Sequence, residues 1–306
     1  MILTSIVIPV LTLVVIFLFG IQKFSKQISQ VAGERFKNIL TRITKTPLRG
    51  VGVGALFTAL IQSSTATTVM LVGLVDAGLL TFSNSLGVII GSNLGTTVTS
   101  QLVAFHFTNI APLFVLLGFL VTYFGGAYKR WGKPLFYFGL VFFSLSLISL
   151  YIEPVKSNPE IIKLFSGITS IYVALLVGII FTAIIQSSSV TSGLVVLLTG
   201  LGLLNIDQAI GVILGANIGT TSTALLASIG KNIGARKVAI AHFLFNVLGV
   251  IMFLPFIGEF VKFVESIGGS SQQVVVNAHI IFNLTCAIIF LILLRPFEKF
   301  INRITA

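Results

Sequence analysis

Two clusters of amide and hydroxyl side chains interrupt apolar runs of the chain, and their residue types are suited to binding ions. The first lies in GALFTALIQSSTATT at residues 54–68, and the second lies in GIIFTAIIQSSSVTS at residues 178–192. Hydroxyl, amide and backbone oxygens can coordinate a hard cation such as sodium. Hydroxyl and amide donors, together with backbone N–H groups at helix N-termini, can hold an anion without arginine. The clusters therefore predict a site for sodium and a small anion.

The clusters belong to an internal repeat whose offset is 124 residues, the separation of Gln62 and Gln186. The same offset aligns GVIIGSNLGTTVT at residues 87–99 with GVILGANIGTTST at residues 211–223, without a gap. Such self-similarity indicates one structural unit made twice. Polar residues in membrane helices often only bond to neighbouring helices, and glycine often only permits close packing. Two copies of both motifs at one spacing nevertheless favour a binding site.

The composition places these motifs in a membrane. Hydrophobic residues make up 56% of the 306 residues and charged residues only 9%, against about 25% charged residues in soluble domains. A helix needs about 20 apolar residues to cross the hydrocarbon core. Seven runs are of about this length, at residues 4–21, 84–104, 109–127, 134–151, 208–228, 237–256 and 275–294.

The regions that hold the polar clusters are interrupted and cannot cross as ordinary helices. Within residues 51–80 the cluster leaves apolar arms that are each too short to span the bilayer. A re-entrant hairpin, or one long helix unwound at its centre, would fit, because free backbone groups at membrane depth must lie inside protein or beside water. A second interruption is expected within each of the other aligned motifs. Its residues are Gly91, Asn93, Gly95, Thr96 and Thr97 in one copy and Gly215, Asn217, Gly219, Thr220 and Thr221 in the other.

The net charge of +11 is concentrated in short hydrophilic links, which is the positive-inside pattern of cytoplasmic loops rather than a nucleic-acid surface. This pattern predicts an N-terminus outside and a C-terminus in the cytoplasm. Charge counting does not separate inverted from parallel repeats, but inverted repeats are typical of secondary transporters. The expected fold is an all-α polytopic membrane protein with two inverted repeats, each with a re-entrant hairpin and a broken transmembrane helix.

Four segments are expected along the chain. Residues 1–21 form a first transmembrane helix, and residues 22–50 form a basic amphipathic segment on the cytoplasmic membrane surface. Residues 51–151 form the first repeat and residues 152–306 form the second. No nucleophile is paired with a general base, so an enzyme is not expected. A buried Asp, Glu or His relay for protons is lacking as well, and this favours sodium as the coupling ion.

The paired sequences QSST at residues 62–65, QSSS at 186–189, GSNLGTT and GANIGTT resemble the type II sodium/phosphate cotransporters. The resemblance covers nearly the whole chain from about residue 50. It implies an inverted-repeat transporter that holds phosphate between its two QSS motifs, with sodium nearby. The phosphate ligands that it implies are Ser63, Ser64, Thr65, Asn93, Ser187, Ser188, Ser189 and Asn217. The sodium ligands are Gln186, Ser187, Thr220 and Thr223, with Gln62, Ser63, Thr96 and Thr99 as the repeat equivalents.

Two departures from the family pattern affect what can be carried over. Thr65 replaces a third serine but keeps the hydroxyl, and residues 101–109 lack the acidic residue of electrogenic members. The second departure leaves the sodium stoichiometry open. Some bacterial family members also carry a soluble regulatory domain. This sequence shows no such domain, so any regulation here is expected to use a separate cytoplasmic protein.

The sequence thus predicts a sodium-dependent phosphate symporter of the plasma or inner membrane that works by alternating access. Expected partners are inorganic phosphate, sodium and the lipid bilayer, with a homodimer as a further expectation and with no cofactor and no nucleic acid. The alternatives are a sodium-coupled carrier of another small oxyanion and a membrane sensor that docks a regulator on residues 22–49. The echoing AHFLFN at residues 241–246 and AHIIFN at 278–283 are expected to make hydrogen bonds between helices.

Overall fold

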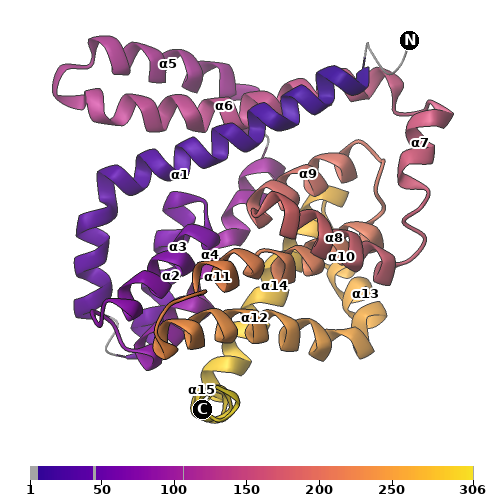
Figure 1. Ribbon diagram of the computed structural model, residues 1–306. Coiled ribbons are helices and arrows are strands. Elements are labelled where there is room, and N and C mark those ends of the chain that lie inside the picture. Colours follow the sequence, from indigo (N-terminus) through magenta and orange to yellow (C-terminus); the bar gives the residue numbers. More distant parts are fainter. Residues whose placement is uncertain (1–5, 44–45, 106, 306) are drawn as a thin grey trace.

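The computed structural model describes residues 6–43, 46–105 and 107–305, and this part of the chain is helical with no strand. Figure 1 shows the helices as a layered bundle. The first half contains α1 (Ile8–Ile43), α2 (Pro47–Ile61), α3 (Ser64–Asp76), α4 (Phe82–Ala104), α5 (Ala111–Phe124) and α6 (Lys129–Ile152). The second half contains α7 (Pro159–Phe165), α8 (Ile171–Ile185), α9 (Ser188–Gly200), α10 (Ile206–Gly219), α11 (Thr221–Ala227), α12 (Ile233–Phe253), α13 (Ile257–Ile267), α14 (Ser271–Ile292) and α15 (Leu294–Ile304).

Six of the described helical segments are long and apolar enough to cross a membrane, as a multi-pass protein requires. They are Ile8–Val31, Phe107–Phe124, Gly126–Val155, Ile206–Ala227, Ile233–Ile267 and Ser271–Ile292. The seventh expected span, at residues 84–104, coincides with α4, which has 23 residues and would be about 35 Å long. This helix is not among the six apolar segments, and it carries Ser, Thr, Asn and Gln along its length.

Helices α1, α5 and α6 form a peripheral layer beside the helices that carry the polar clusters (Figure 1). Helix α6 packs along both α1 and α5. Helix α1 is continuous over 36 residues, so the expected boundary between residues 21 and 22 falls inside a helix. The basic segment therefore begins as an extension of the first span. The expected basic segment at residues 22–50 falls partly outside the described residues, at residues 44 and 45.

Each repeat contains two short helices that meet at the polar cluster. Helices α2 and α8 have 15 residues each, and helices α3 and α9 have 13 each. The first pair meets at Gln62 and the second pair at Gln186. The expected interruption of both apolar runs at the clusters is therefore confirmed.

The second expected interruption is wrong in the first repeat, where α4 continues unbroken through residues 91–97. Its hydroxyl side chains turn back to carbonyls of the same helix, as Ser92 Oγ does to Ile89 O at 2.8 Å and Thr96 Oγ1 does to Ser92 O at 3.1 Å. Helical bonding is thus kept despite the polar residues. In the second repeat only Thr220, itself in a right-handed helical conformation, separates α10 from α11.

The glycines of these motifs allow helices to cross closely instead of breaking them. A Cβ atom on Gly91 would lie 2.1 Å from the carbonyl oxygen of Val51, where α4 crosses α2. A Cβ atom on Gly215 would lie 2.1 Å from the carbonyl oxygen of Leu175, where α10 crosses α8. These contacts are related by the 124-residue offset, so the repeat is preserved in the backbone packing.

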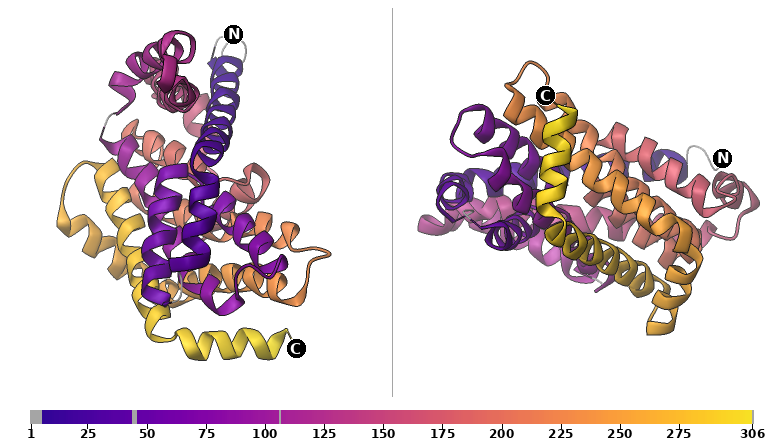
Figure 2. Two further views of the ribbon diagram at one scale, coloured as in Figure 1. Left: turned by 90° about the vertical axis from the view of Figure 1, so that its left-hand side faces the viewer. Right: turned by 90° about the horizontal axis from the view of Figure 1, so that it is seen from below.

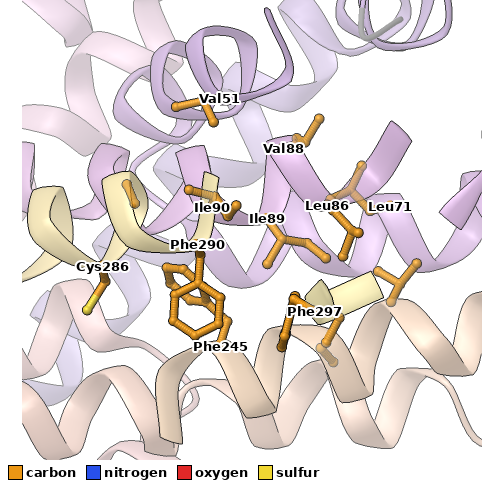
Figure 3. Close-up of a cluster of buried hydrophobic side chains, with 14 of the residues drawn as sticks. Val51, Leu71, Leu86, Val88, Ile89, Ile90, Phe245, Cys286, Phe290 and Phe297 are labelled. Atoms are coloured by element: carbon orange, nitrogen blue, oxygen red, sulfur yellow. The ribbon is translucent and has the colours of Figure 1, made fainter. Parts of the chain in front are cut away.

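A hydrophobic cluster joins α2, α3 and α4 of the first repeat to α12 and α14 of the second. Figure 3 shows Ile89 and Ile90 of α4 near Phe245 of α12 and Phe290 of α14. Helix α15 follows α14 directly and, in the left view of Figure 2, lies across the end of the bundle. Its contact with the cluster is made by Leu294, Phe297 and Ile301.

Candidate functional site

The site begins with an unusual backbone conformation at two glutamines. Gln62 has φ 55° and Gln186 has φ 59°, and they are the two non-glycine residues with positive φ in the described chain. Each ends one helix, and the serine that follows caps the next, with Ser63 Oγ accepting from Ala66 N at 3.1 Å and Ser187 Oγ from Val190 N at 3.4 Å. The left-handed conformation costs free energy and is often found at functional sites.

A pair of threonines joins the two short helices of each repeat. The hydroxyls of Thr58 and Thr67 lie 2.8 Å apart in the first repeat, and those of Thr182 and Thr191 lie 2.7 Å apart in the second. All four side chains are buried. We did not predict these pairs from the sequence, although each flanks its QSS motif at the same spacing. These bonds hold together the two short helices that meet at each glutamine.

The polar turns of the two repeats meet each other by equivalent hydrogen bonds. Thr65 Oγ1 donates to Gln186 O at 3.2 Å, and Ser189 Oγ donates to Gln62 O at 3.1 Å. Thr65 and Ser189 are repeat equivalents, so each turn contacts the backbone of the other in the same way. The structure therefore brings the two QSS motifs together at one place.

The first predicted sodium set is largely bonded within the protein. Thr99 Oγ1 donates to Gln62 Oε1 at 2.6 Å and also lies 3.2 Å from Ser189 Oγ. Thr96 is buried and bonds to its own helix, while Ser63 serves as the helix cap. Gln62 and Thr99 are therefore adjacent, and the oxygens of Thr96 and Ser63 have protein partners.

The second predicted set of sodium ligands has fewer of its side chains bonded within the protein than the first. Thr220 Oγ1 lies 3.0 Å from Thr65 Oγ1, and Gln186 contributes its backbone oxygen to Thr65. The Gln186 side chain is exposed and makes no hydrogen bond among the described residues. Thr223 Oγ1 is buried and has no protein partner within the same part of the chain. Its hydroxyl is available for an ion.

The predicted phosphate ligands Asn93 and Asn217 occupy equivalent buried positions with different partners. Asn217 Nδ2 donates to Asn283 Oδ1 on α14 at 3.4 Å. Asn93 Nδ2 is buried and finds no acceptor among the described residues. A buried donor without an acceptor is costly unless a ligand or water completes it.

The predicted phosphate ligands Ser64 and Ser188 are the first residues of α3 and α9 and are buried. The first N–H groups of a helix lack partners within the helix, and the helix dipole places partial positive charge there. Thr65 and Ser189, which follow these serines, meet the opposite repeat. Two helix N-termini and a set of neutral donors therefore converge, and this arrangement can hold an anion without a basic residue.

One of the two histidine motifs, AHIIFN at residues 278–283, takes part in the hydrogen bonding around the site. His279 Nδ1 lies 3.0 Å from Ser100 Oγ on α4, next to Thr99, so the expected bond between helices is confirmed there. Within each motif the asparagine donates to the carbonyl of the histidine at 2.9 Å, from Asn246 to His242 and from Asn283 to His279. The ring of His242 is buried and has no partner in the described part of the chain.

A polar clamp that we did not predict from the sequence joins the end of α3 to the start of α12. Lys231 Nζ lies 3.1 Å from Asp76 Oδ2, and Asn232 N donates to Asp76 Oδ1 at 3.0 Å. Asn232 Nδ2 also donates to Asp76 O at 2.9 Å. The backbone bond from Asn232 and the neighbouring Lys231 hold the pKa of Asp76 below its usual value of 3.8. The signal in the sequence was an acidic residue at the end of an apolar run.

Comparison with known proteins places the chain in a family. The Na+/Pi-cotransporter family pattern matches residues 16–150 and 159–288. The Bacillus subtilis (strain 168) protein YqeW, itself uncharacterized, is 33% identical over 87% of this chain and 87% of its own length. The putative inorganic phosphate export protein YjbB of Escherichia coli (strain K12) is 29% identical over 81% of this chain.

A mammalian relative extends the comparison. The sodium-dependent phosphate transport protein 2A of Rattus norvegicus is 25% identical over 74% of this chain and 56% of its own length. The chain spans about half the length of this protein and of YjbB, for which the matched share is 46%. No solved structure matches the chain. The family match covers most of its residues, and the chain belongs to the Na+/Pi-cotransporter family.

Proposed function

We propose that this protein transports inorganic phosphate together with sodium by alternating access, and that the ions bind where the two QSS motifs meet. The observation that carries the proposal is the reciprocal contact of the motifs, from Thr65 to Gln186 O and from Ser189 to Gln62 O. A site made by both repeats changes whenever the repeats move relative to each other. This is the property that alternating access requires.

In this proposal the phosphate lies between the N-termini of α3 and α9. Ser64 and Ser188 donate hydroxyl hydrogens, first-turn N–H groups face the anion, and Asn93 Nδ2 supplies a donor that lacks a protein acceptor in the described chain. The remaining predicted ligands are Ser63, Thr65, Ser187, Ser189 and Asn217. Neutral donors can bind phosphate and still release it. After release, the empty site contains no buried arginine whose charge would be left without a partner.

Sodium is proposed to bind through neutral oxygens at both glutamines. The second set, Gln186, Ser187, Thr220 and Thr223, contains the free buried hydroxyl of Thr223. In the first set, Gln62, Ser63, Thr96 and Thr99, the bond from Thr99 holds the Gln62 oxygen beside the Thr99 hydroxyl, and both oxygens keep a lone pair for sodium. Sodium and phosphate would attract each other strongly in the low dielectric, and this gives a physical basis for coupling.

The membrane arrangement is part of the same proposal. We propose that the repeats are inverted and that the helix pairs α2–α3 and α8–α9 are re-entrant. The N-terminus would then lie outside and the C-terminus in the cytoplasm. The name of YjbB specifies export, whereas the name of the rat protein specifies sodium dependence and no direction. A symporter runs in either direction according to its ion gradients, so one mechanism accommodates both.

Radiolabelled phosphate flux in proteoliposomes tests the proposal. Phosphate uptake should require an inward sodium gradient, with potassium as the control, and reversing the gradient should drive efflux. Ser188→Ala should abolish the sodium-dependent flux. Ser144→Ala is the matched control, because Ser144 is equally buried but bonds only to Val141 O in α6, at 2.8 Å.

Two results would contradict the proposal. Phosphate flux that is equal in sodium and potassium would exclude sodium coupling. Sodium-dependent flux of sulfate or a carboxylate, with no competition from phosphate, would instead favour another oxyanion as the substrate.

A further inference from the structure

A groove of about 530 Å³ lies where α12 begins and α15 ends, away from the QSS motifs. Its lining combines two basic residues with aliphatic side chains from both helices. The lining residues are Ile233, Arg236, Lys237, Ile240, Ile304 and Thr305. None of them was predicted to bind phosphate or sodium.

The position of the groove relative to the membrane follows from the helices that form it. The apolar span Ile233–Ile267 begins at the groove, and the span Ser271–Ile292 ends immediately before α15. Helix α15 lies across the end of the bundle in the left view of Figure 2. It buries one apolar face and exposes Arg295, Lys299 and Arg303 on the other side. A basic amphipathic helix with this placement lies at the level of the lipid headgroups.

The positive charge of the groove has no acidic partner within the described chain. Arg236 is exposed and Lys237 is half-buried, and neither forms an ion pair there. The nearby carboxylates are engaged elsewhere, since Asp76 binds Lys231 and Glu298 accepts a hydrogen bond from Ser83. Two unpaired cations therefore stand beside aliphatic side chains at the membrane boundary.

We propose that this groove binds an anionic phospholipid from the leaflet that contacts this end of the bundle. Arg236 and Lys237 bind the headgroup phosphate, because a guanidinium matches phosphate oxygens and an ammonium adds a point charge. Ile233, Ile240 and Ile304 contact the start of the acyl chains. The lipid bridges α12 and α15 and fixes α15 against the membrane.

Native mass spectrometry of the full chain purified in detergent tests the proposal. The protein is incubated with phosphatidylglycerol or with phosphatidylcholine, and lipid retention is compared. The wild type should retain phosphatidylglycerol preferentially. The variant Arg236→Gln/Lys237→Gln should retain it about tenfold less, since each basic residue near a membrane surface contributes to anionic lipid binding.

The matched control is Arg295→Gln/Lys299→Gln, which removes the same charge from exposed positions of α15 outside the groove lining. It should retain phosphatidylglycerol like the wild type. Equal losses in both variants would show a diffuse charge effect and overturn the specific groove. Equal retention of phosphatidylcholine by the wild type would overturn it as well.

A third arm distinguishes a lipid from free phosphate, because both present the same phosphate chemistry. Millimolar inorganic phosphate should not displace phosphatidylglycerol, since it offers nothing to the three isoleucines. Displacement by phosphate would assign the groove to a soluble anion and overturn the lipid proposal. If the double variant fails to run as a single species in size exclusion, Lys237→Gln alone is used, with a loss of about threefold expected.

Discussion

The two repeats share their helix crossing but differ in how far each is closed. A Cβ atom on Gly91 or on Gly215 would lie 2.1 Å from a carbonyl oxygen of the crossing helix. The backbone packing of the two repeats therefore matches. At the polar turns the match ends. The Gln62 side chain is only 6% exposed and accepts from Thr99, whereas the Gln186 side chain is exposed. Similar local sequence has therefore produced two environments.

A second difference lies at the two ends of α4. The clamp of Asp76, Lys231 and Asn232 lies near its first residue. At its last turn a hollow of about 470 Å³ is lined by Val103, Thr108 and Gly200 among others. The 124-residue offset of the repeat explains why only one end of α4 has the clamp. Gly200 occupies the position equivalent to Asp76, and Phe107 and Thr108 occupy those of Lys231 and Asn232.

The two copies share the residues that form the helix crossings and differ in the residues that hold one conformation. Shared glycines and threonine pairs build the common framework, while contacts present in only one copy hold one end together. Under the proposed transport mechanism, the clamp end is the closed end in this structure and the hollow end is the more open one. Ion binding would shift the balance by contacting one arrangement more favourably than the other.

The largest expected effect concerns the shared framework. Gly91→Ala and Gly215→Ala should each destabilise the protein by about 1–3 kcal/mol or more, because the added methyl overlaps a carbonyl oxygen. Gly73→Ala is the control, since nothing lies within 4 Å of its Cβ position and alanine favours the helix. Thermal unfolding in detergent measures the three. A clear difference between the first two would contradict equivalent frameworks.

The next effect sharpens the difference between the polar turns. Gln62→Asn should cost about 1–3 kcal/mol, because the shorter amide loses the buried 2.6 Å bond from Thr99, whose hydroxyl then keeps only Ser189 Oγ at 3.2 Å. Gln186→Asn should change stability by less than about 0.5 kcal/mol, because the side chain is exposed. Asparagine tolerates the left-handed conformation, so neither variant should strain the backbone at its position. Both variants should nevertheless reduce sodium-dependent phosphate flux, and equal unfolding midpoints would refute the asymmetry.

A smaller effect tests the clamp. Asp76→Ala should change the rate of sodium-dependent flux more than Lys231→Ala, because it also removes the bond from Asn232 N. Both changes should be at most about fivefold, because exposed ion pairs contribute little. The double variant should match Asp76→Ala, since that change already removes the contact with Lys231. Lys156→Ala is the control, because it breaks the exposed pair with Glu153 at 2.7 Å within one segment. Additive changes would show that the two residues act separately.

The smallest effect is the pH dependence of the clamp. The folded state lowers the pKa of Asp76, so its contribution is present above the ordinary value of 3.8 and is lost as the pH falls through and below it. The difference in unfolding temperature between the wild type and Asp76→Asn should be constant from pH 5 to pH 8 and shrink toward pH 3. A difference that shrinks with rising pH would have the wrong sign.

Much of the site could be predicted from the sequence because its residues lie inside a repeat. The QSS motifs, the break at each glutamine and the pairing of the two copies follow from the offset from Gln62 to Gln186. The expected break within α4 was wrong because glycine and threonine have two uses. They can interrupt a helix or, as Gly91 and Thr96 do, permit a close crossing and bond back to the same helix.

The sequence by itself determined the membrane setting, the family resemblance and which residue types stand at the site, because these depend on composition and spacing along the chain. Only the tertiary structure decided that Thr65 reaches Gln186 O, that Gln62 is enclosed while Gln186 is not, and that Asp76 is clamped. These contacts join residues more than 100 positions apart, and their partners are chosen by how whole helices pack. The clamp residues are present in only one copy of the repeat, but that Asp76 meets Lys231 and Asn232 depends on how distant helices pack.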